Sequence, residues 1–239
     1  MKNNLNTLEA LDKFINVVKE LRSEHGCPWD KAQTHESLRM QLIEEAYEAA
    51  DAMLNYKDKG EIDNLREELG DILLQVVMHS VIAEEENIFT LEDVVNEISE
   101  KMIHRHPHVF GTKDPDNQTL TKTWEELKAE EKEHKKDTTP PLHGIPKSLP
   151  ALLKSAKVQK KADTIYKHKI EKEVSLSQIA LLANQLKNTS SKEQTEKLMT
   201  AMLYHMTNVA WQDKINLEEC LMNKTSTLIQ TLEPENQEF

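Results

Sequence analysis

The chain has 239 residues, a formal net charge of −12 and 30% charged residues. Non-specific nucleic-acid binding is not expected from so negative a chain, because it depends on basic surface. Only 5 glycines and 8 prolines occur and aromatic residues make up 5%, so the composition favours an all-α protein.

No apolar run approaches the ~20 residues of a membrane-spanning helix. The first residues lack the apolar centre of a signal peptide. Cys27 and Cys220 are far apart in the sequence and have no metal-type spacing. We therefore expect a cytoplasmic protein with free thiols and no membrane partner.

Apolar residues at helical spacing predict four helices in the first hundred residues. The first spans roughly residues 5–25 and ends at the turn GCPWD. The second runs from Leu38 to Met53, and a turn at Lys59-Gly60 leads to the third, from Leu65 to Val77. Thr90 and Asp93 predict a capping box at the start of the fourth.

A loop containing HPHVFG follows, and then a fifth helix from about Thr121 to the charged residues before Asp137. Five Pro and Gly residues gather between Pro140 and Pro150, which marks a linker. We expect a catalytic domain at residues 1–137, a linker at 138–150 and a second helical domain at 151–239 with four more helices. The last two helices begin near Ser191 and at Asn216, where Glu219 completes a capping box.

The two halves show signs of an internal repeat. DILLQVVMHSVIA, from Asp71, aligns with LMTAMLYHMTNVA, from Leu198. In this register Glu68 corresponds to Thr195, and Asp71 corresponds to Leu198. The second domain is thus predicted to be a degenerate copy that lacks the acidic residues of the first.

Four carboxylates form two short pairs on neighbouring predicted helices, namely Glu45/Glu48 and Glu68/Asp71. At about 100° per residue, Glu45 lies about 20° from Leu38 and Glu68 lies about 40° from Ile72, so both acids fall inside apolar stripes. Buried acids that repel one another need a cation. The pattern predicts a Mg²⁺ site, with Mn²⁺ as an alternative, although a single ExxE pair is usually a solvated face.

The strings LIEEAYEAAD and EELGDILLQV resemble the EExxE and ExxD signature of the MazG-type nucleoside triphosphate pyrophosphohydrolases. GCPWDKAQTHESL, HRHPHVFG and IPKSLPALL extend the resemblance over the first ~150 residues. The resemblance implies an all-α helical bundle of the NTP pyrophosphatase type, a homodimer or higher homo-oligomer, and Mg²⁺-dependent hydrolysis of nucleoside triphosphates to monophosphate and pyrophosphate. Carried over by position, the metal ligands are Glu45, Glu48, Glu68 and Asp71.

The resemblance also matches Lys101 and Arg105 to a K-x₃-R pair, and Trp124 and Lys128 to a W-x₃-K pair. Each pair is spaced i,i+4 and so shares a helix face. An arginine fork suits phosphate oxygens, and an indole can stack on a base; alone, these residues would be surface charges and a packing tryptophan. Glu44, beside the proposed ligands, is a candidate to accept a proton from water.

Several alternatives stay open. The protein could be a catalytically silent nucleotide-sensing or partner-binding scaffold, or an enzyme restricted to dUTP, dCTP or phosphoribosyl-ATP. His104, His106 and His108 could suggest zinc, but no fourth partner is evident, and a loop beside the active site is favoured. His79 is either a polar partner of Glu68 or a satisfied buried histidine. The basic segment from Lys154 to Lys169 is interpreted as a solvated helix in preference to a nucleotide or RNA contact.

Overall fold

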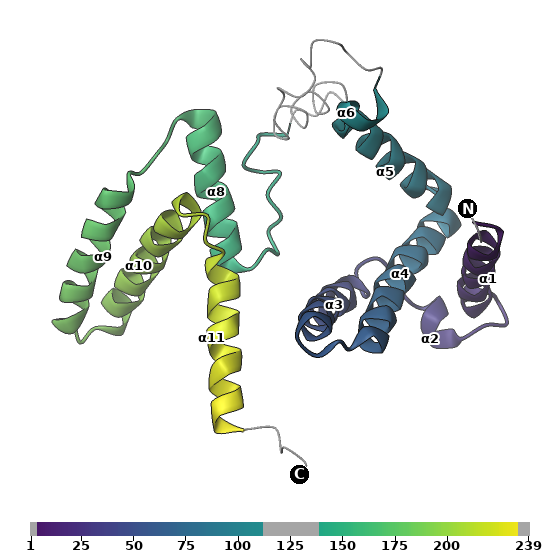
Figure 1. The fold of residues 1–239 in the computed structure, drawn as a ribbon, viewed down its shortest axis with the longest axis horizontal. Helices are drawn as coiled ribbons and strands as arrows, with labels where there is room; N and C mark the ends of the chain where they lie inside the picture. Colours follow the sequence, from purple (N-terminus) through teal and green to yellow (C-terminus); the bar gives the residue numbers. More distant parts are fainter. Residues whose placement is uncertain (1–3, 112–138, 234–239) are drawn as a thin grey trace. The chain divides into compact units, whose positions relative to one another are not determined.

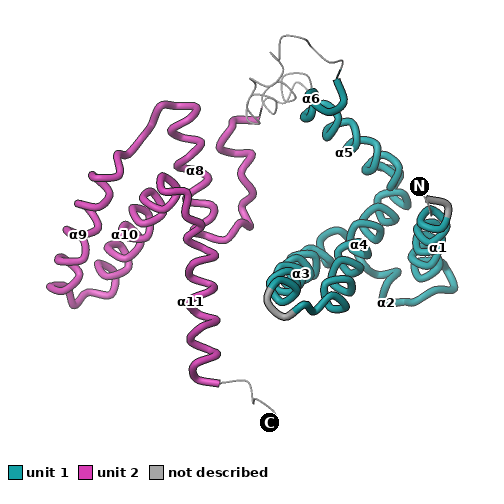
Figure 2. The backbone as a smooth tube through the Cα atoms, in the orientation of Figure 1, with its two compact units in different colours: residues 1–129 teal, residues 130–239 magenta. Residues whose placement is uncertain are grey.

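The computed structural model describes residues 4–111 and 139–233. In this part of the chain the regular structure is entirely helical, which confirms the all-α prediction (Figure 1). The chain divides into two compact units, residues 1–129 and 130–239 (Figure 2). The predicted fifth helix lies outside the described residues. None of the described helices has the length and apolar character needed to cross a membrane.

The described residues of unit 1 contain the four helices predicted from apolar spacing and two short ones that were not predicted. The first, α1, ends at Arg22, three residues before its predicted end. Pro107 begins α6 where a loop was predicted, because proline suits the first position of a helical turn. The bounds are α1 Asn4–Arg22, α2 Pro28–Lys31, α3 Arg39–Lys59, α4 Ile62–Glu85, α5 Leu91–Arg105 and α6 Pro107–Phe110.

The core of unit 1 forms where α4 packs against α1 and the residue before α3. Val77 is fully buried, and it packs in one cluster with Val18 of α1 and with Leu38. On its other side α4 packs along α3. Only a short turn joins these two helices, so they run antiparallel. Gly60 makes this turn in the left-handed conformation (φ 74°), which glycine adopts at little cost.

Arg22 ties the start of unit 1 together. Its guanidinium donates two hydrogen bonds to the carboxylate of Glu85, at 3.0 and 2.7 Å. It also donates to the carbonyl oxygens of Asp30 and Gln33. The side chain of Arg22 is only 5% exposed, so this single residue fixes α1, the end of α4 and the segment leading into α3.

Unit 2 is built around α10, which packs against α8 and α9. The side chain of Ser191 accepts a hydrogen bond from the backbone N–H of Gln194 at the start of α10. At α11 only half of the predicted capping box is present: Asn216 Oδ1 accepts from the N–H of Glu219, but the Glu219 carboxylate accepts from the side-chain amide of Asn216 and not from its backbone N–H. The bounds are α8 Ala151–Tyr166, α9 Lys172–Lys187, α10 Lys192–Gln212 and α11 Leu217–Leu232.

The helices α4 and α10 end with the same hydrogen-bond pattern. Ile88 donates its backbone N–H to Ala83, as Ile215 does to Ala210, at 2.9 and 2.8 Å. The residue before each isoleucine is left-handed, with φ 57° at Asn87 and φ 59° at Lys214. The equivalent residues are Ala83 and Ala210, Asn87 and Lys214, and Ile88 and Ile215. Each pair is 127 residues apart, which is the register in which Glu68 corresponds to Thr195.

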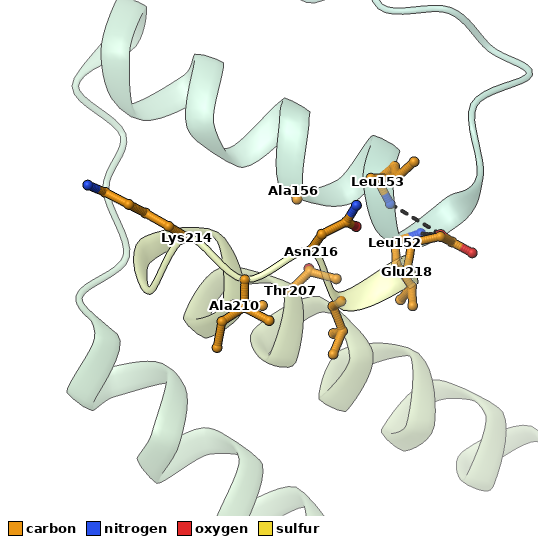
Figure 3. A pocket seen from close by; sticks show the side chains of 10 residues that line it. Leu152, Leu153, Ala156, Thr207, Ala210, Lys214, Asn216 and Glu218 are labelled. Atoms are coloured by element: carbon orange, nitrogen blue, oxygen red, sulfur yellow. Dashed lines mark hydrogen bonds between the residues drawn. The ribbon is translucent and has the colours of Figure 1, made fainter. Parts of the chain in front are cut away.

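A cavity of about 270 Å³ lies between α8 and the turn from α10 to α11 (Figure 3). The acid that lines it, Glu218, accepts hydrogen bonds from the backbone N–H groups of Leu152 and Leu153, at 3.2 and 3.4 Å. A carboxylate at the start of a helix satisfies N–H groups that have no partner within the helix. Glu218 therefore caps α8 and fastens α11 to it.

Candidate active site

The antiparallel helices α3 and α4 bring the predicted acids together. One carboxylate oxygen each from Glu45, Glu48 and Glu68 lies within 4.8 Å of the others. Glu45 and Glu68 are half-buried and Glu48 is exposed. Asp71 lies outside this group of three, but its charge acts on both Glu45 and Glu68. We call Glu45, Glu48, Glu68 and Asp71 the acidic cluster.

Mutual repulsion and burial both disfavour the charged forms of the two half-buried acids. Burial raises the pKa of Glu45, and the charges of Asp71 and Glu48 raise it further. Burial likewise raises the pKa of Glu68, followed by the charges of Glu48 and Asp71. Among the described residues, the charges acting on the two groups are all carboxylates. A bound cation would reverse this repulsion.

The donor set fits a hard divalent cation. Glu68 Oε2 is buried without a hydrogen-bond partner among the residues that the structure describes, and a buried carboxylate oxygen normally has one. Several carboxylate oxygens converging from two helices are the ligands that Mg²⁺ and Mn²⁺ accept. The acidic cluster would hold such an ion between α3 and α4.

Lys101 and Arg105 are half-buried near the end of α5. Figure 1 shows α5 leading away from the α3–α4 pair, and neither residue is among the charges acting on Glu45 or Glu68. The two cations and the acidic cluster are thus not brought together within one chain. Trp124 and Lys128 lie outside the described residues. Glu44 is exposed on α3, and its charge acts on Glu45.

Two contacts beside the acidic cluster were not predicted. The side chain of Gln41 hydrogen-bonds to Glu45, which opposes the rise in its pKa. His79 pairs with His35 through their Nδ1 atoms at 2.8 Å, and the two rings are stacked. His79 is thus a satisfied histidine. Gln41 could have been found because it lies four residues before Glu45, whereas the pairing of His35 with His79 depends on packing.

The remaining candidates were the three alternating histidines and the basic segment from Lys154 to Lys169. Their residues lie in helices or contact other groups of the chain. His104 lies in the last turn of α5 and His108 lies in α6, while His106 Nδ1 hydrogen-bonds to the carbonyl oxygen of Met102 at 2.7 Å. Within the basic segment, Lys161 donates to the carbonyl oxygen of Pro141, and Lys169 forms an ion pair with Glu171. These contacts favour the interpretation of that segment as a solvated helix.

Comparison with known proteins bears on the same part of the chain. Residues 33–110, which include the acidic cluster, match the MazG nucleotide pyrophosphohydrolase domain. The nucleoside triphosphate pyrophosphohydrolase/pyrophosphatase MazG of Thermotoga maritima is 35% identical over 219 residues, which cover 92% of this chain and 82% of that protein. The nucleoside triphosphate pyrophosphohydrolase of Escherichia coli K12 is 38% identical over 160 residues, 66% of this chain and 59% of its own length.

The uncharacterized protein YabN of Bacillus subtilis is 47% identical over 148 residues. These residues cover 62% of this chain but only 29% of YabN. The chain thus spans less than two thirds of the B. subtilis and E. coli relatives, and most of the T. maritima one.

Paired carboxylates facing each other from two antiparallel helices are arranged like the ligands of helical carboxylate metal centres. The matched domain and the similarity to the T. maritima protein agree with this arrangement, and they identify the family. The chain belongs to the MazG nucleotide pyrophosphohydrolases.

Proposed function

We propose that this protein hydrolyses nucleoside triphosphates to monophosphate and pyrophosphate in a Mg²⁺-dependent reaction, removing unwanted or surplus nucleotides. The observation that carries the proposal is the convergence of Glu45, Glu48 and Glu68 within 4.8 Å. Relatives named as nucleoside triphosphate pyrophosphohydrolases support the same reaction. Family membership alone would also be compatible with a catalytically silent scaffold. The presence of all four acids of the acidic cluster favours an enzyme.

The acidic cluster would hold the ion, which supplies charge neutralisation of the phosphates and a lower pKa of bound water. Glu44 accepts the proton of the attacking water. The water oxygen forms a bond to phosphorus, and the bridge between the α- and β-phosphates breaks, so that pyrophosphate leaves. Lys101 and Arg105 bind phosphate oxygens through charge-assisted hydrogen bonds.

We further propose that the active form is a homodimer or higher homo-oligomer, in which Lys101 and Arg105 reach the acidic cluster of a second copy. In support, α5 leads away from the acidic cluster of its own chain (Figure 1). Leu69, Leu73 and Val76 form an exposed apolar stripe along α4, at 48%, 42% and 38% exposure. Contiguous exposed apolar residues are typical of protein interfaces.

Unit 2 is proposed to be a degenerate copy of unit 1 that serves packing or assembly. The matching ends of α4 and α10 support the repeat. Cytoplasmic activity is part of the proposal and agrees with Cys27 and Cys220, which are both free thiols.

The test is pyrophosphate release from a panel of canonical and modified nucleoside triphosphates, with and without Mg²⁺. Glu45→Gln is expected to lower the rate by at least about 100-fold, because even groups that only support metal ligands cost 10–100-fold. The matched control is Glu173→Gln, which removes an exposed acid from the first turn of α9 and should leave the rate unchanged. Orthophosphate release would identify a different bond, and nucleotide binding without turnover would favour the sensing scaffold.

A further inference from the structure

Gln75 is a buried amide on the same face of α4 as the acidic cluster. It lies one turn beyond Asp71 and two turns beyond Glu68, and residues at these spacings share a helix face. The residue is only 3% exposed. Its Oε1 is buried and has no hydrogen-bond partner in the described part of the chain. Two buried acceptors without partners, Glu68 Oε2 and Gln75 Oε1, therefore lie on one face of one helix.

The pairing of α3 with α4 shows where Gln75 lies along the site. At one level Glu45 and Glu48 meet Glu68. Farther along, His79 meets His35, at the segment before α3. Because the helices are antiparallel, Gln75 falls between these two levels. On α3, Gln41 lies one turn before Glu45, and its side chain hydrogen-bonds to Glu45.

A buried amide oxygen without a partner destabilises a fold, and an apolar side chain of the same length would not. Such a group calls for a donor that binds there, and buried water commonly fills this role between polar groups. The neighbouring carboxylates offer further acceptors for the second O–H of the same water.

We propose that Gln75 is a further catalytic residue, whose Oε1 accepts a hydrogen bond from the water that attacks the triphosphate. This inference rests on the proposed function. An amide oxygen is a poor base, so Gln75 orients the water and does not take its proton. One O–H points to Gln75 and the other to a carboxylate, which leaves a lone pair of the oxygen free to attack phosphorus. Glutamine orients the attacking water in the same manner in GTPases.

The test compares Gln75→Met, which keeps the chain length and removes the amide, with Gln75→Glu, which keeps an acceptor oxygen. Loss of the acceptor is expected to lower kcat by about 100-fold with little change in KM, and Gln75→Glu should retain more of kcat than Gln75→Met. Ser80→Ala is the control, because Ser80 is also buried on α4 but its hydroxyl donates to the carbonyl oxygen of Val76. Its kcat should match that of the wild type.

Two readouts do not depend on turnover. A crystal structure of the wild type without nucleotide is expected to show a water within about 3 Å of Gln75 Oε1, and the Gln75→Met structure should lack it. The Mg²⁺-induced rise in Tm should persist in Gln75→Met, because Gln75 holds water and is not a metal ligand.

The possible outcomes separate the two proposals. A wild type that releases no pyrophosphate contradicts the proposed function, whereas an active wild type with an equally active Gln75→Met contradicts the role of Gln75 alone. Loss of the Mg²⁺ response in Gln75→Met would also overturn it, by making Gln75 a ligand. If Gln75→Met does not fold, Gln75→Glu and the wild-type density still decide: absence of the water would reject the inference.

Discussion

The pairs α3–α4 and α9–α10 solve the problem of buried polar groups in different ways. Between α9 and α10, Asn208 donates to Ser175, whose hydroxyl also pairs with His205 Nδ1 at 3.1 Å. Between α3 and α4, in contrast, carboxylates face one another and Glu68 Oε2 has no partner. The α9–α10 pair thus satisfies these polar groups with one another, whereas the α3–α4 pair leaves a buried carboxylate oxygen available for a ligand.

One residue of unit 2 qualifies this contrast. Gln159 Oε1 is also buried without a partner. Its amide nitrogen, however, lies within 3.0 Å of Ser155 Oγ, Thr207 Oγ1 and the carbonyl oxygen of Tyr204. Gln159 therefore joins α8 to α10. An unpartnered atom thus indicates a ligand site when neighbouring groups repel one another, as in the acidic cluster.

The largest expected effect comes from giving α4 the residues of α10. The double variant Glu68→Thr, Asp71→Leu should lower pyrophosphate release by more than about 100-fold, because ligands contribute more than the groups that support them. It should also raise the Tm without metal, since repulsion among the carboxylates is relieved, and abolish the rise on adding Mg²⁺.

The control for this variant is Glu193→Thr, Glu196→Leu, which removes two acids at the same spacing and introduces the same two residues on exposed positions of α10. Its pyrophosphate release and its Mg²⁺ response should equal those of the wild type. A Glu68→Thr, Asp71→Leu protein that retains activity would contradict both the metal site and the distinction between the units.

The reverse substitution gives α10 the acid that α4 carries at the equivalent position, and it tests the packing of α10. Leu198 is 8% exposed, and Leu198→Asp should destabilise unit 2 by about 3–5 kcal/mol, because it removes buried apolar contacts and places a charge there. Urea unfolding followed by Trp211 fluorescence measures this. Met199→Asp, at the adjacent and 52% exposed position, should cost less than about 1 kcal/mol. Equal effects would show that Leu198 is not part of the core.

The sequence predicts the main helices and the acids, but not the contacts that join distant segments. Apolar spacing identifies α1, α3, α4 and α5, and local chemistry identifies the capping box of Thr90 with Asp93, which is present. The bond between Arg22 and Glu85 joins residues 63 positions apart, and no local pattern indicates it. In the sequence, Gln75 is likewise only one polar residue within an apolar helix. That its side-chain oxygen is buried depends on the tertiary packing of α4.

The two units also fasten their first helix differently, and this difference can be measured. Unit 1 uses the ion pair of Arg22 with Glu85, and unit 2 uses the amide of Gln159. Arg22→Ala should cost about 2–3 kcal/mol, below the usual range for a buried pair because the Glu85 side chain is 46% exposed. Lys19→Ala is the control, since Lys19 and Glu84 are both more than 40% exposed, and should cost less than about 1 kcal/mol. Comparable losses of unfolding free energy would reject the role of Arg22 as a buried tie.

The smallest effect concerns the dependence of unit 1 on pH. Burial lowers the pKa of His79 below its ordinary value of 6.5, and the charge of the neighbouring His35 lowers it further. The unfolded chain therefore binds the proton more readily than the folded one, so stability should be constant above about pH 6.5 and fall as the pH drops from 6.5 to the folded-state pKa. The bond between the two Nδ1 atoms adds to this loss, since it needs one ring nitrogen without a proton.

Thermal unfolding between pH 5 and 8 should therefore give a flatter profile for His79→Gln than for the wild type. His143→Gln, at an exposed position before α8, should leave the slope unchanged. Parallel profiles for wild type and His79→Gln would mean that the histidine pair contributes nothing to the pH response of unit 1.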